Sequence, residues 1–149
     1  MANPVRWEVQ GLRDLDKRLQ RLSAKAAGSA ARGATGKAAG LVKKAVVAKI
    51  IANPSVDTGS LRDSVIVKKV PKGQTNVASE HMVTFRGRGK PYNKKGQKIN
   101  RAPHAHLVEF GTVNMPAEPS LRPGFDNNID AAIKVMAQTL EKRLLKEGV

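Results

Sequence analysis

The stretch VDTGSLRDSVIV (residues 56–67) separates a first part of helical character from a region of strands. Asp57 can accept hydrogen bonds from the amides of residues 59 and 60, forming an Asx-turn or helix cap. Ser60 and Asp63 stand at the spacing of a capping box, with Asp in place of Glu. The β-branched residues at the end of the stretch favour a strand. We therefore predict a tight turn, a single helical turn and then a strand.

A long helix is predicted before this stretch. Four leucines fall at helical spacing with charged residues between them: Leu12, Leu15, Leu19 and Leu22. Residues 24–40 are mostly Ala, Gly, Ser and Thr, so this part is either a helix that another backbone approaches closely, ordered mainly by assembly partners, or a flexible linker. The apolar pattern resumes through Ile50 and favours helix. One helix over 12–52 would be about 60 Å long, with a break predicted near Gly28–Gly36.

Short elements complete a predicted α+β fold with a long N-terminal helix, a small antiparallel β-sheet and a C-terminal amphipathic helix. Alternation at Val5, Trp7 and Val9 predicts a first short strand. Residues 65–70 and 77–86 predict an antiparallel hairpin, and 104–110 a strand or one turn of helix. Residues 114–123 predict a loop with three prolines. The last helix spans 126–147, with Asp126 or Asn127 as its cap, Gly148 past its end, and an inward face at Ile129, Ile133, Met136, Leu140 and Leu144.

The composition bounds the class of protein. The chain has 149 residues, a net charge of +15, no cysteine and 3% aromatic residues. This length suits a single domain, 1–149, with a basic loop insertion at about 86–103. The absence of cysteine excludes disulfides and thiolate metal sites and agrees with assembly in the host cytoplasm. No apolar run approaches the roughly 20 residues of a membrane helix, and the first residues lack the apolar core of a signal peptide.

Residues 86–101 form a strongly basic segment without an acidic residue. Removing its basic side chains would lower the net charge from +15 to +8. Gly, Pro and Asn predict a loop, which could bind phosphates without sequence specificity, dock on an acidic surface of a neighbouring protein, or be merely solvated. The candidate contacts to a polyanion or partner are Arg86, Arg88, Lys90, Lys94, Lys95, Lys98 and Arg101.

Signs of catalysis are weak. The triplet Asp57-Thr58-Gly59 also marks aspartic proteases, but that chemistry needs a second carboxylate from another lobe or a dimer partner, in an all-β chain with a flap. His104 and His106 could share a metal, yet only Glu109 stands near them, which makes a poor ligand set. We expect no catalytic residue, no metal and no cofactor.

A second informative stretch lies at His104–Phe125, with the sequence HAHLVEFGTVNMPAEPSLRPGF. Together with residues 56–64 it resembles the neck or tail-completion family, the head–tail joining proteins of phages with long non-contractile tails. That family tends to show Asp-Thr-Gly-x-Leu-Arg-x-Ser, then Val-Glu-Phe-Gly-Thr, Met-Pro-Ala-x-Pro and Leu-Arg-Pro-x-Phe, all present here in this order. The chain departs from the pattern at Ser120, where an aromatic is common, and in its longer, more basic segment 86–101.

The resemblance implies a non-enzymatic structural protein of the virion, located at the head–tail junction. It implies a homo-oligomeric ring, most often of six copies, stacked between the portal or head stopper and the tail terminator or tail tube, through which DNA passes. A tail terminator capping the tube, or a stand-alone basic nucleic-acid-binding protein, are the alternatives. No membrane partner is expected.

The roles expected for the motif residues are structural or in subunit contacts. Glu109 is expected to pair with Arg62 or Arg122, and Gly111 to adopt a backbone conformation closed to other residues. Pro116, Pro119 and Pro123 are expected to stiffen the loop before the last helix. The complete set comprises Asp57, Thr58, Gly59, Leu61, Arg62, Ser64, Glu109, Phe110, Gly111, Thr112, Pro116, Arg122 and Pro123.

Overall fold

The computed structural model describes residues 12–53, 59–71, 79–87, 95–98 and 101–148. The predicted strand at Val5–Val9 and the Asx-turn at Asp57 lie outside these ranges. The elements in chain order are α1 (Leu12–Gln20), α2 (Ala24–Ile51), α3 (Ser60–Ser64), β1 (Val65–Lys69), β2 (His81–Phe85), α4 (Ala105–Phe110), α5 (Leu121–Asp126) and α6 (Ile129–Lys146). The predicted α+β class is confirmed.

The N-terminal helical region is broken, but not at its glycines. The chain leaves α1 at Gln20, and Ser23 starts α2 by accepting a hydrogen bond from the amide of Ala26 (3.3 Å). The prediction of a break near Gly28–Gly36 is wrong, because α2 runs through this segment as one helix of 28 residues. The serine N-cap stabilises a new helix start at Ser23, whereas glycines flanked by alanine cost only about 1 kcal/mol each and do not interrupt α2.

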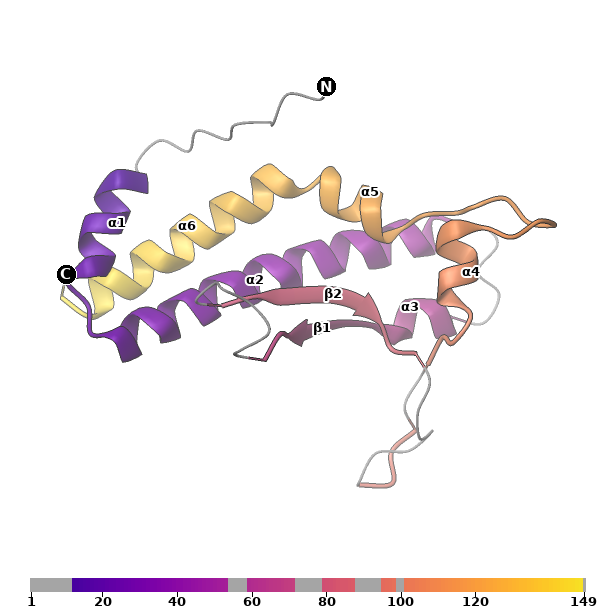
Figure 1. Cartoon of the computed structure of the whole chain (residues 1–149), viewed down its shortest axis with the longest axis horizontal. Coiled ribbons are helices and arrows are strands. Elements are labelled where there is room, and N and C mark those ends of the chain that lie inside the picture. Colours follow the sequence, from indigo (N-terminus) through magenta and orange to yellow (C-terminus); the bar gives the residue numbers. More distant parts are fainter. Residues whose placement is uncertain (1–11, 54–58, 72–78, 88–94, 99–100, 149) are drawn as a thin grey trace.

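Helices α2 and α6 form the long axis of the molecule, lying side by side in opposite directions (Figure 1). The face of α2 carries small buried residues in one row: Ala30, Ala34 and Ala38. On α6, Ala132 and Thr139 are buried, whereas the predicted inward residues other than Leu144 are only half-buried. Small residues on both helices allow close approach, which explains the composition of residues 24–40.

The two strands pair in an antiparallel hairpin, as predicted, and both the hairpin and α6 lie along α2 (Figure 1). Val65 lies opposite Phe85 and Lys69 opposite His81. Val83 and Phe85 pack against the core. One core cluster joins the helices to the hairpin, and its buried members are Ala38, Val42, Val46, Ile50, Leu61, Val65, Ala102, Ala105 and Ala132.

The region before α6 differs from the prediction. Within residues 104–110 the structure forms the helix α4, but the predicted loop over 114–123 ends at Ser120, and α5 begins at the next residue, Leu121. Pro123 occupies the third position of α5, within the first turn, where its missing N–H leaves no hydrogen bond unmade. Asn128 takes the N-cap position of α6, so the prediction of Asp126 or Asn127 as its cap is wrong. The Asn128 side chain makes no capping hydrogen bond to α6 and donates to the carbonyl of Gly124 (3.0 Å).

Candidate functional site: a clasp and an exposed turn

The first motif forms the short helix α3 and leads directly into β1. Gly59 precedes α3 with a φ of +65°, in the left-handed region that favours glycine. Glycine thus occupies the N-cap position, and the predicted capping box led by Ser60 is not formed. Ser64 is fully buried and donates its hydroxyl to the carbonyl of Leu61 (2.7 Å). Its own carbonyl accepts from the amide of Arg86 (2.7 Å), which fixes α3 to the end of β2.

Glu109 closes a clasp between α4 and α5. Its carboxylate accepts hydrogen bonds from the amides of Ser120 (2.9 Å) and Leu121 (3.0 Å), with a longer one from the amide of Arg122 (3.4 Å). These are amides at the start of a helix, which have no partner within the helix and attract negative charge. Glu109 therefore acts as a cap delivered from another element, 11 residues earlier in the chain.

The expected ion pairs of Glu109 are wrong. Arg62 pairs with its neighbour Asp63 (2.8 Å), which by hydrogen bonding and then by charge attraction raises the pKa of the Arg62 guanidinium. Arg122 approaches Glu109 through its main-chain amide. A backbone partner satisfies the carboxylate with less loss of side-chain entropy than a long, exposed arginine would.

The chain between the two ends of the clasp makes a tight turn. Gly111 has a φ of +76°, as predicted for a position closed to other residues. A Cβ atom on it would lie 2.8 Å from the amide nitrogen of Ala117. Thr112 and Met115 then pair through their backbones, with N–O distances of 2.8 and 3.3 Å. Phe110 and Val113 are left strongly exposed, at 82% and 103%.

The two motif stretches meet around the end of α2. Leu61 shares the core cluster with Ala105, and Val108 and Leu121 pack against it. A cavity of about 450 Å³ lies between them, lined by Leu61, Val108, Glu118 and Ser120 among others. At its edge the Asn53 amide donates to the Glu118 carboxylate (2.6 Å). The described parts of the two motif stretches, 59–64 and 104–125, thus lie together at one end of the molecule.

A family model described as "Bacteriophage HK97-gp10, putative tail-component" matches residues 13–111 of the chain. The chain belongs to this HK97-gp10-like family. Its members are structural components of bacteriophage tails, which agrees with the neck and tail-completion resemblance of the motifs. No curated protein and no solved structure matches the chain. The match runs from α1 to Gly111, so the turn, α5 and α6 lie beyond it.

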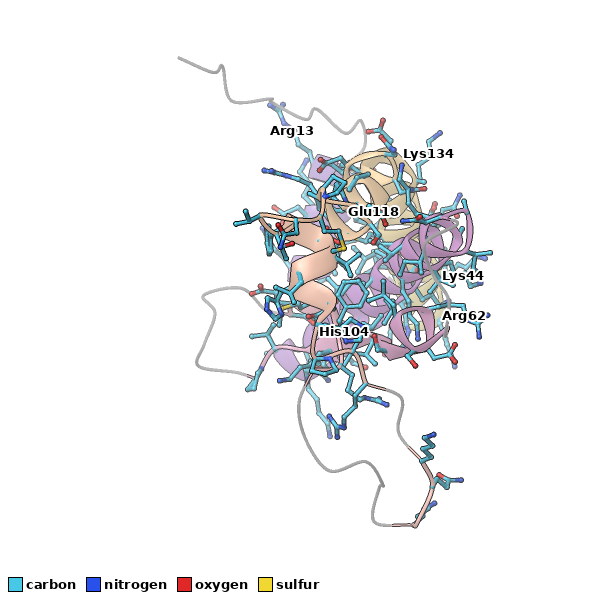
Figure 2. The ribbon with its side chains drawn as sticks, turned by 90° about the vertical axis from the view of Figure 1, so that its right-hand side faces the viewer. Arg13, Lys44, Arg62, His104, Glu118 and Lys134 are labelled. Carbon is cyan, nitrogen blue, oxygen red and sulfur yellow. The ribbon has the colours of Figure 1, made fainter. Side chains whose placement is uncertain are left out.

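The basic segment of this HK97-gp10-like chain begins and ends against the sheet. The amide of Ala102 donates to the carbonyl of Arg86 (2.9 Å), and Arg101 donates to the carbonyl of Gly87 (3.2 Å). Lys95 and Lys98 are exposed, whereas Arg88, Lys90 and Lys94 lie outside the described residues. Figure 2 shows further cations, Lys44, Arg62 and Lys134, on one side of the molecule.

The polar side chains of the described ranges include His, Asp and Glu, the kinds of ligand group that a metal ion needs. Among those residues no group of three or more His, Cys, Asp or Glu side chains could hold a metal ion. His81 and Thr35 form a hydrogen bond (2.9 Å) that sequence reasoning did not foresee, because 46 residues separate them. The helices within those ranges include none long and apolar enough to cross a membrane.

Proposed function

We propose that the chain is a ring-forming subunit of the phage neck that joins the head to the tail and lets DNA pass. The observation that carries the proposal is the membership in a family of phage tail components, combined with the four motifs of the tail-completion proteins. The expected neighbours are the portal or head stopper on one side and the tail terminator or tail tube on the other.

The chemistry of the motif end supports a structural role. The carboxylate of Glu109 accepts hydrogen bonds from backbone amides, so it holds α4 and α5 together. The turn at Thr112–Met115 exposes apolar side chains on a stiff backbone. An exposed apolar turn whose backbone is already fixed is suited to contact another protein, because little ordering entropy is lost on binding.

The charge of the chain supports contact with a polyanion or an acidic neighbour. Twenty-seven basic residues face only twelve acidic ones. A ring whose inner surface is basic would bind DNA at low salt and release it as the salt concentration rises. Docking onto an acidic ring would also weaken with salt, so salt dependence alone does not distinguish the two contacts. We propose the protein-docking role for segment 86–101 and keep DNA contact as the outcome that a separate measurement would reveal.

The experiment that tests the proposed function is inactivation of the gene in a phage that carries it, followed by electron microscopy of the lysate. A neck subunit predicts DNA-filled heads and separate tails of normal length, and the wild-type chain supplied in trans restores joining. Tails of irregular length would indicate a tail terminator instead. Complete, infectious particles would reject the structural role and favour a nucleic-acid-binding protein outside the virion.

A further inference from the structure

The turn at Thr112–Met115 presents two apolar side chains that the chain itself does not cover. Val113 is 103% exposed and Met115 is 39% exposed; we call these two residues the tip. The backbone of the tip is held by the Thr112–Met115 pairing and by the hydrogen bond from the Glu118 amide to the Val108 carbonyl (2.8 Å). The tip is therefore a preformed apolar knob, and binding it would cost little ordering entropy.

The same chain carries an apolar groove of about 1010 Å³ between α2, β2, α5 and α6. Alanines of α2 form part of its lining, and larger apolar side chains stand along it: Met82, Phe125, Ile133 and Met136. Phe125 and Met82 are about half exposed there. The groove explains why the inward face of α6 is only half-buried in a single copy.

The tip of one chain does not enter its own groove. Phe110, at the base of the turn, borders one end of the groove, but the turn extends past the ends of α2 and α5 (Figure 1). The tip carries no charge, and the charged residues that line the groove, Glu80, Glu109 and Arg122, sum to one negative charge, although the chain as a whole carries +15. The net positive charge opposes the association of two copies, and an uncharged tip entering this groove adds nothing to that repulsion.

We infer that the tip of one copy occupies the groove of the next copy. The contact uses two different patches, a convex one and a concave one, so it is heterologous and generates a ring when its rotation closes. This inference rests on the proposed function, because it names the contact that would build the ring.

A cysteine pair tests the contact, since the chain has no cysteine of its own. Val113→Cys on the tip is combined with Met82→Cys at the groove, and the full chain is crosslinked with a short bis-maleimide at a concentration where light scattering detects oligomers. The matched control combines Val113→Cys with Lys142→Cys, an exposed position of α6 outside the groove. We expect a ladder of covalent oligomers, formed at least about tenfold faster than in the control, because a docked neighbour raises the effective thiol concentration.

A second variant separates contact from folding. Val113→Asp should convert the oligomers to monomers while leaving the melting temperature of the dilute monomer unchanged, because Val113 is fully exposed within its own chain. Oligomers that crosslink no faster than the control, or oligomers that survive Val113→Asp, would overturn the inference but leave the neck function standing. A chain that stays monomeric at all concentrations would also overturn it. So would a monomer in which Trp7→Cys crosslinks to Met82→Cys, since the N-terminal segment of the same chain would then occupy the groove. Failure of the proposed function is seen separately, as normal particles after gene inactivation.

Discussion

Removing the Glu109 carboxylate is the most informative single change in the motif region. The side chain accepts two short hydrogen bonds, from the amides of Ser120 (2.9 Å) and Leu121 (3.0 Å). A hydrogen bond to a charged group contributes about 1.5–3 kcal/mol net, and loss of a helix cap costs about 0.5–2 kcal/mol. Because Glu109 is half-buried and water can replace part of its role, we expect Glu109→Ala to lower the free energy of unfolding by about 2 kcal/mol.

The assay is thermal unfolding followed by circular dichroism. For a chain of this length about 2 kcal/mol corresponds to a melting temperature lower by roughly 4–8 °C. Glu109→Gln keeps one neutral acceptor and should lose about half as much. Glu141→Ala, on the exposed face of α6, is the matched control and should melt like the wild type.

Two results would contradict a stabilising backbone cap by Glu109. One is a Glu109→Ala variant that melts with the Glu141→Ala control, which would mean that the clasp contributes nothing. The other is an equal loss in Arg122→Ala, which would restore the ion pair in place of the backbone cap. Because Arg122 contributes its main-chain amide to the clasp, Arg122→Ala should change the melting temperature little.

Three further predictions concern glycines and charge. Gly111→Ala should destabilise the fold by about 1–3 kcal/mol, since it places a Cβ at positive φ against Ala117, whereas Gly40→Ala, with open space in α2, should stabilise by up to about 1 kcal/mol; chemical denaturation of both variants measures this. Gly124→Ala should cost about 1–3 kcal/mol because its Cβ would overlap Val46, and the loss should shrink when Val46→Ala is added, which a double-mutant cycle measures. Neutralising the lysines of the basic segment should weaken joining of heads to tails in a complementation assay, whereas normal joining with altered DNA retention or ejection would favour DNA contact; the changed residues are Lys94, Lys95 and Lys98.

Periodicity and turn chemistry were sufficient to predict the general fold. The helix pattern, the β-branched run after Ser64 and the hairpin pairing all follow from local sequence. The position of the helix break does not, because it depends on the balance between the serine cap of α2 and glycines such as Gly33, beside which Arg143 of α6 lies. The short helix α5 escaped prediction because two prolines and a glycine surround its start, and its amides are capped from Glu109 rather than by a neighbouring residue.

The candidate site could be predicted in its residues but not in its contacts. The motifs identified Glu109 and Gly111, and the left-handed conformation of Gly111 followed from residue type alone. The partners of Glu109 did not follow from the sequence. Sequence patterns favour charge pairs and cannot show that the backbone amides of Ser120 and Leu121 donate to the carboxylate. The groove was also hidden, since its walls come from α2, β2 and α6, which lie far apart in the chain.

Cryo-electron microscopy of the head–tail joint of a phage that encodes this chain would show whether the chain forms a ring at the neck. We expect a closed ring of copies at the joint, between the portal or stopper and the tail, with α2 and α6 of each copy visible side by side in the density. Density for the chain only at the far end of the tail, or absence of the chain from purified particles, would contradict a role at the neck.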